Sequence, residues 1–119
     1  MKDGLYHKEI AMPREVATLK AVTIRPTHTR HAREAALTDR YGVINLPEVV
    51  SFSGADVVEA EITEGRVSKL VVRRPYDEAR DIVMAIGFRN SESFLKSVWF
   101  NLRNDVHSTL KREIYNKSI

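Results

Sequence analysis

The chain has 119 residues, about the size of one domain, and its 43% hydrophobic and 29% charged content is that of a globular protein. It contains no cysteine, which excludes disulfides, thiolate metal sites and thiol nucleophiles. Its formal net charge of +3 is too small to attract phosphate strongly over the whole surface.

The N-terminal part of the chain has the weakest pattern. Its first ten residues, MKDGLYHKEI, lack the apolar segment of a signal peptide, and no apolar run reaches the roughly 20 residues of a membrane helix. We therefore expect a soluble, cytoplasmic protein with no membrane partner. Residues 1–13 are interpreted as an arm, followed by a single α+β domain at 14–119. Residues 16–24, VATLKAVTI, alternate as a strand does, although their Ala, Leu and Lys content is also compatible with a helix.

Residues 27–42, THTRHAREAALTDRYG, predict the main helix. Thr27 follows Pro26 and suits an N-cap, and Gly42 suits a left-handed C-cap, so we expect a helix at 27–41. Its apolar stripe consists mostly of alanines, which bury little surface alone. We therefore expect this helix to pack on a sheet.

The second half of the chain predicts four strands in an antiparallel meander, at residues 57–63, 66–74, 80–88 and 94–102. Glu64 and Gly65 form the two-residue turn of the first hairpin. The predicted fold is α+β: one main helix packed on a four-stranded antiparallel sheet, with an N-terminal arm or strand and a short C-terminal helix or turn. The predicted core residues are Ile62, Leu70, Val72, Ile82, Met84, Ile86, Val98 and Phe100.

Charge is unevenly distributed along the chain. Residues 25–33 contain three arginines and two histidines without an acid, whereas residues 56–64 contain four acids without a base. This pattern predicts a one-sided surface that could bind nucleic acid, although a solvated charged face is the commoner explanation of such runs. The candidate nucleic-acid-binding residues are Arg25, His28, Arg30, Arg33 and Lys111.

Several short motifs resemble those of small uncharacterised proteins of tailed phages, over roughly residues 27–115. They are His31-Ala32, the stretches DRYG at 39–42 and RRPYD at 73–77, and the tail motif DVHSTL at 105–110 that leads to Tyr115. The layout is also similar to that of the barnase, EndoU, colicin and RelE superfamily of metal-independent ribonucleases. The resemblance implies an RNA-cleaving protein of the host cytoplasm or the virion, with RNA as its partner and no cofactor.

Cleavage of RNA by its own 2′-OH needs a base, an acid and a cation near the phosphorane. Histidine suits both proton roles, so His31 and His107 are the candidate pair. Arg73 or Arg74 would hold the phosphate, and Tyr115 would stack on a base or bind the phosphate. A metal site made of His28, His31 and Asp39 is rejected, because ligands spread along one helix do not converge.

Structural roles explain the same residues. His31 suits a packing position, Asp105 an N-cap before a C-terminal helix, and the Arg73-Arg74 pair a charged strand edge. The alternative function is therefore a non-catalytic phage structural or interaction protein. It would bind another subunit, a host protein or a second copy of itself through the N-terminal arm and a sheet edge.

Overall fold

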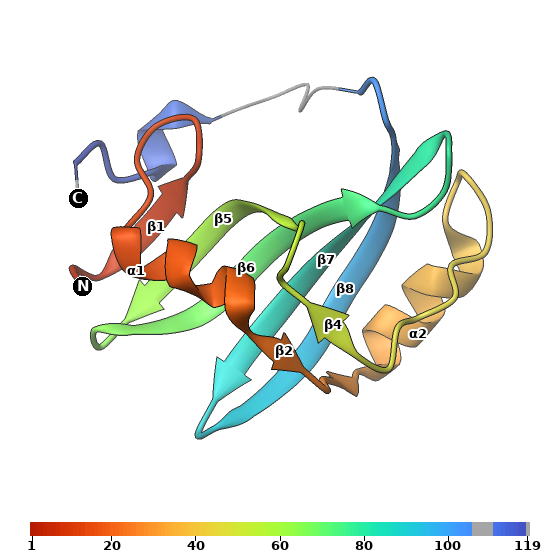
Figure 1. Ribbon diagram of the computed structural model, residues 1–119, viewed down its shortest axis with the longest axis horizontal. Helices are drawn as coiled ribbons and strands as arrows, with labels where there is room; N and C mark the ends of the chain where they lie inside the picture. Colours follow the sequence, from red (N-terminus) through yellow and green to blue (C-terminus); the bar gives the residue numbers. More distant parts are fainter. Residues whose placement is uncertain (106–110, 119) are drawn as a thin grey trace.

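The computed structural model describes residues 1–105 and 111–118, and it is mostly sheet (Figure 1). Strands hold 45% of the residues and helices 15%. The elements in chain order are β1 (Gly4–His7), α1 (Arg14–Ala17), the 3₁₀ turn η1 (Thr18–Ala21), β2 (Thr23–Ile24), β3 (Thr27–His28), α2 (Arg30–Thr38), β4 (Val50–Ser51), β5 (Asp56–Thr63), β6 (Arg66–Pro75), β7 (Arg80–Arg89), β8 (Glu92–Leu102) and the 3₁₀ turn η2 (Arg112–Ile114).

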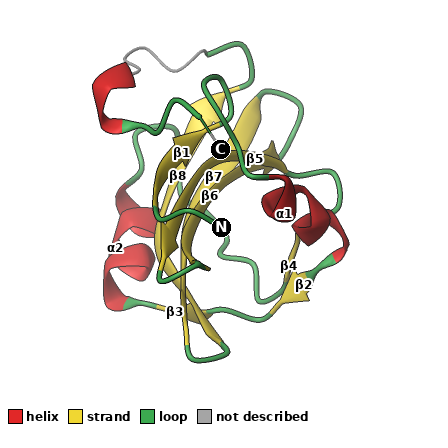
Figure 2. Cartoon of the chain, turned by 90° about the vertical axis from the view of Figure 1, so that its left-hand side faces the viewer, coloured by secondary structure: helices red, strands yellow, loops and turns green. Residues whose placement is uncertain are grey.

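The predicted fold class, one main helix on a four-stranded antiparallel sheet, is wrong. The main sheet has six strands in the order β1-β5-β6-β7-β8-β3, and it is mixed because β3 runs parallel to β8. Strands β2 and β4 form a separate antiparallel pair. Figure 2 shows α1 and this pair on one side of the sheet. Strand β1 comes from the part of the chain with the weakest sequence pattern, whereas β3 consists of Thr27 and His28, which were predicted to begin the main helix.

Helix α2 packs along β8 instead of across the sheet (Figure 1). Its buried residues are only Ala32 and Ala36, which offer too little apolar surface to cover a sheet face. It is also shorter than predicted at both ends. Thr29 is the N-cap and accepts a hydrogen bond from the Ala32 amide at 3.1 Å, and the helix ends at Thr38 with an extended Asp39 as C-cap instead of Gly42. No helix in the described residues is long and apolar enough to cross a membrane.

Residues 16–24 form mainly helical turns, so the favoured strand is wrong except at Thr23 and Ile24. Val16 is buried and Leu19 packs against the same core. A spacing of three residues brings two side chains to one side of a helical turn, whereas a strand would separate them. Packing on the core therefore overrides the β-propensity of this segment.

The predicted core is confirmed, and all eight predicted residues are buried. All of them except Ile62 lie with Val16 of α1 and Val50 of β4 in one cluster, on the face that we call the inner face. The opposite, outer face carries a smaller cluster of Val58, Val71 and Val83, packed with Ala85 and Trp99.

The predicted hairpin is also confirmed. Thr63 pairs with Arg66, and both turn residues have positive φ, 53° at Glu64 and 74° at Gly65. The turn between β7 and β8 has the same form, with φ of 49° at Asn90 and 69° at Ser91. Two left-handed residues match the twist of the strands that they join.

Both edges of the main sheet are covered by non-strand segments. Along β1, the Asn116 amide donates to the Leu5 carbonyl at 2.8 Å. Along β8, beyond its short pairing with β3, the Phe100 amide donates to the Asp39 carboxylate at 3.2 Å. These contacts satisfy backbone groups that would otherwise invite edge-to-edge association.

A charged cluster joins the ends of β6, β7 and β8 on the outer face. Asp81, 8% exposed, accepts hydrogen bonds from Arg73 at 2.8 Å and from Arg103 at 3.0 Å. Burial raises the pKa of Asp81, but the hydrogen bonds from the two arginines outweigh it and hold the pKa below its ordinary value. Asp81 is therefore ionised and fixes both arginines.

We expect Asp81→Asn to lower the free energy of unfolding by about 3 kcal/mol at neutral pH, because two arginines lose their shared partner. Urea denaturation measures this loss. Because the pKa of Asp81 is lowered in the folded state, its contribution is present above the unfolded value of about 3.9 and is lost as the pH falls through the folded value. The difference between wild type and variant should therefore shrink in acid.

The matched control is Asp56→Asn. The ion pair of Asp56 with Lys8 is half-exposed, so its loss should cost less than about 1 kcal/mol. Equal losses at the two positions would show that Asp81 does not anchor this corner of the sheet.

Candidate functional site: the outer face of the sheet

The outer face of β6, β7 and β8 combines aromatic and basic side chains. Trp99 is half-buried beside Val71 and Val83. Phe94, also half-buried, pairs with Gly87, which lies on the outer face by alternation with Ala85. Lys69 pairs with Gly87 from the other side. A row from β6 to β8 therefore presents a lysine and an aromatic ring.

A β-bulge adds a second lysine to this row. Ala85 pairs with Ser97 and Ile86 with Leu95, which leaves Lys96 as the extra residue of β8. Its side chain lies over Gly87, where a Cβ would come within 2.8 Å of the Lys96 Cδ. Gly87 thus gives the lysine room to lie across the sheet.

The C-terminal tail, residues 111–118, brings Tyr115 to the β1–β5 end of the same face. Its hydroxyl donates a 2.6 Å hydrogen bond to Glu59, whose other carboxylate oxygen is 3.9 Å from the Lys69 ammonium. His7 of β1 is 3% exposed, and its ring meets that of Tyr115 edge-on at 5.2 Å. The His7 Nδ1 accepts from the Glu9 amide at 3.1 Å.

The electrostatics of this cluster favour a neutral phenol beside a carboxylate. Burial raises the pKa of Tyr115 to about 12, helped by its hydrogen bond to Glu59 and by the negative charge of that carboxylate. Tyr115 therefore keeps its proton at neutral pH and orients Glu59. A carboxylate held between a hydroxyl and an ammonium can accept a proton while the ammonium stabilises an anion.

The structure does not bring together those predicted catalytic residues that it describes. His31 is exposed on α2, next to β8, whereas Tyr115 lies at the β1–β5 end, with β6 and β7 in between. His107 lies outside the described residues, so its pairing with His31 stays a prediction.

The two candidate phosphate-binding arginines lie on opposite faces. Arg73 donates four hydrogen bonds, to the Asp81 carboxylate and to the carbonyls of Leu102, Arg103 and Asp105, so its guanidinium is largely occupied. Arg74 lies on the inner side and donates to the Ser51 carbonyl at 3.1 Å. Neither arginine faces Glu59 together with Tyr115.

The predicted nucleic-acid-binding residues are divided between two places. Four surround β3 and α2, and three of them make local contacts. His28 bonds to the Pro47 carbonyl at 2.8 Å, Arg30 to Glu34 at 3.0 Å and Arg33 to the His28 carbonyl at 3.1 Å. Arg25 is exposed, and Lys111 is exposed at the start of the tail. They do not form one continuous surface.

Sequence reasoning missed His7, Glu59, Lys69 and Lys96. The alternation in β6 does place Lys69 opposite the core positions Leu70 and Val72. The contact of Glu59 with Lys69, however, depends on a shift in the register between β5 and β6. The contact of Tyr115 with Glu59 depends on packing of the tail against the sheet. Among the described residues, no group of three or more His, Asp or Glu side chains is placed to hold a metal ion.

We expect Tyr115 to ionise at about pH 12, later than a tyrosine with the ordinary value near 10. Phenolate absorbance, compared between wild type and Tyr115→Phe, measures this step. Because the folded-state pKa is raised, the contribution of Tyr115 to stability is present below about pH 10 and is lost as the pH rises through 12. Glu59→Gln should bring the ionisation closer to pH 10. Ionisation of Tyr115 at its ordinary pH would contradict a buried contact with Glu59.

Comparison with known proteins identifies no relatives. No protein-family model matches the sequence, no curated protein matches it, and no solved structure is detectably similar. The resemblance to phage proteins and to metal-independent ribonucleases therefore remains a hypothesis, and the function has to be argued from the side chains of this chain.

Proposed function

We propose that the protein binds single-stranded RNA on its outer face and cleaves it without metal beside Glu59. The observation that carries the proposal is the Glu59 carboxylate held between the Tyr115 hydroxyl and the Lys69 ammonium. This group lies on the same face as two partly exposed aromatic rings and an exposed lysine.

Binding would combine stacking with phosphate contacts. Phe94 and Trp99 offer rings on which unpaired bases stack, a contact that tolerates any base. Lys69 and Lys96 would contact the phosphates. Lys69 and Phe94 lie two strand spacings apart, about 10 Å, which suits neighbouring nucleotides. A strand of RNA along this row would reach Glu59.

Cleavage would use the 2′-OH of the bound RNA as the nucleophile. Glu59 accepts the proton of the 2′-OH, whose oxygen bonds to the adjacent phosphorus. Lys69 stabilises the negative charge of the phosphorane and gives a proton to the departing 5′ oxygen. The products are a 2′,3′-cyclic phosphate and a 5′-hydroxyl. Tyr115 keeps Glu59 oriented and takes no part in the proton transfers.

We expect the protein to cleave an unstructured RNA in the presence of a chelator, and Glu59→Gln to slow cleavage by about 10² or more, as loss of a general base does. Gel analysis of a labelled oligonucleotide, with identification of the cyclic phosphate, measures both. The matched control is Glu61→Gln, on the same strand, whose carboxylate bonds to Ser68 instead of Tyr115. The control should keep its activity.

Binding is measured separately with a 2′-O-methyl oligonucleotide, which lacks the nucleophile. Phe94→Ala and Lys96→Ala should weaken binding, and Lys96→Ala should reduce the dependence of log K on log salt by about 0.7. Arg14→Ala, which removes an exposed charge from α1, should change neither the affinity for the oligonucleotide nor its salt dependence. No binding would contradict the whole proposal, whereas binding without cleavage would contradict the role of Glu59.

One observation favours the alternative, a structural or interaction protein without catalysis. Leu37 near the end of α2 is 67% exposed, and Val43 in the segment that follows is 60% exposed. Large apolar side chains exposed to this extent are typical of contact surfaces when they gather. Because the sheet edges are covered, such a contact would use this end of α2 instead of strand addition.

Under the alternative, Leu37→Ser with Val43→Ser should abolish self-association or capture of a partner subunit while leaving the fold intact, because both side chains are exposed. Sedimentation velocity over a range of concentrations measures self-association. Thr38→Ser, an exposed neighbour on α2, is the control. A wild-type protein that is monomeric at all concentrations would remove self-association from this alternative.

A further inference from the structure

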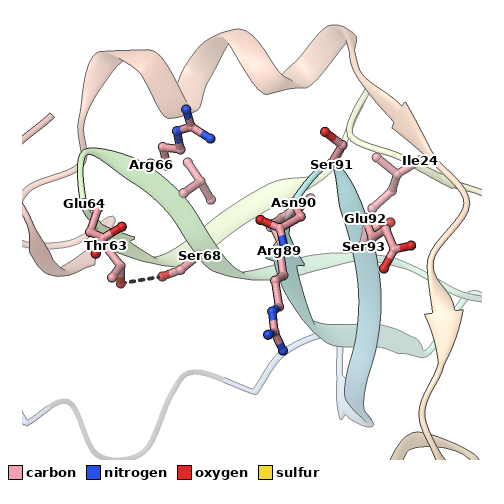
Figure 3. Close-up of a pocket in the computed structure, with 12 residues that line it drawn as sticks. Ile24, Thr63, Glu64, Arg66, Ser68, Arg89, Asn90, Ser91, Glu92 and Ser93 are labelled. Carbon is pink, nitrogen blue, oxygen red and sulfur yellow. Dashed lines mark hydrogen bonds between the residues drawn. The ribbon is translucent and has the colours of Figure 1, made fainter.

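A groove of about 730 Å³ lies between the tips of the two hairpins (Figure 3). The turn between β5 and β6 forms one end, and the turn between β7 and β8 forms the other, next to Ile24 of β2. This volume lies within the roughly 300–1,000 Å³ of small-molecule sites. The lining residues are Ile24, Thr63, Glu64, Arg66, Val67, Ser68 and Phe88 to Ser93.

The floor of the groove is apolar. Ile24, Val67 and Phe88 are partly buried and pack against the inner core. All three therefore belong to the inner side of the sheet, opposite the face proposed for RNA. A ligand in this groove would rest on one aromatic ring and two aliphatic side chains.

The walls are polar, and most of their side chains have no partner in the described residues. Asn90, Ser91, Glu92 and Ser93 make no side-chain hydrogen bond there, whereas Thr63 and Ser68 bond to each other at 3.0 Å. The backbone of both turns is held in left-handed conformations, which fixes the positions of the Cβ atoms of these side chains. The groove thus offers an amide, a carboxylate and hydroxyls on a rigid frame.

The charges of the groove do not select an ion. Glu64 and Glu92 are acidic, and Arg66 reaches the groove as a base. Arg89 points the opposite way from Arg66 (Figure 3). Phosphate would meet two carboxylates, and a polyamine would meet a guanidinium, so neither is favoured.

We propose that this groove binds a neutral carbohydrate. A sugar ring presents an apolar face of C–H groups, which fits the floor, and a rim of hydroxyls, which fits the walls. Amide, carboxylate and guanidinium groups can each bond to two neighbouring hydroxyls.

The test uses ¹⁵N-resolved NMR of the full chain with three neutral trisaccharides at millimolar concentration: maltotriose, cellotriose and triacetylchitotriose. At least one should shift the backbone amides of Val67 and of Asn90 to Ser93, and saturation transfer should place its C–H face on Phe88. Inorganic phosphate and spermidine should leave these amides unchanged. No shift with any of the three sugars, or equal shifts with phosphate, would overturn the proposal.

Variants separate the groove from the outer face. Ser93→Ala should weaken sugar binding about fivefold, since a neutral hydrogen bond contributes about 1 kcal/mol. Ser97→Ala is the matched control, because Ser97 lies on the same strand but pairs with Ala85 on the outer face. An equal loss with the control would overturn the assignment. Ser93 pairs with Phe88 on the inner side, so RNA binding should be unaffected in this variant, and this proposal and the RNA proposal fail independently.

Discussion

The sheet of this protein depends on closing its two edges with segments that are not strands. Unpaired backbone groups at an edge need partners, and a bare edge invites association with another chain. On the β8 side, Asp39 at the end of α2 accepts from the Phe100 amide. On the β1 side, Asn116 of the tail donates to Leu5. Each closure uses a residue far away in the sequence.

The closure at β1 also creates the candidate site. Asn116 fixes the tail against β1, and its neighbour Tyr115 is thereby held over β5, where it bonds to Glu59. The same residues therefore stabilise the edge and orient a carboxylate. A tyrosine that is half-buried for structural reasons can in this way prepare a proton acceptor, because the phenol with its raised pKa remains a donor.

Local signals predicted the central part of the fold well. The turn at Glu64 and Gly65 and the alternation of β6 and β7 depend on neighbours in sequence, and they placed Leu70 and Met84 in the core correctly. The start of α2 was misplaced because Thr27 and Thr29 are both suitable caps, and only the pairing of Thr27 with Phe94 decides between them. Strand β1 could be predicted only as an arm or strand, because its partner β5 lies far along the chain.

The candidate site was harder to predict, for a specific reason. An unbroken two-residue hairpin would pair Glu59 with Leu70 and direct its carboxylate to the inner face. A register shift between Glu61 and Ile62, with one extra residue in β6, pairs it with Val71 instead, on the outer face beside Lys69. Bulges of this kind leave no clear mark in one sequence. Tyr115 was predicted from the sequence as a site residue, but its contact with Glu59 could not be predicted.

The closure of β1 by the tail has a consequence for the order of assembly. Strands β5 to β8 are neighbours in sequence and can pair through short hairpins as soon as they are made. The tail contact joins nearly opposite ends of the chain, so its loop closes last. During synthesis, the Glu59 cluster is therefore incomplete until Tyr115 has left the ribosome.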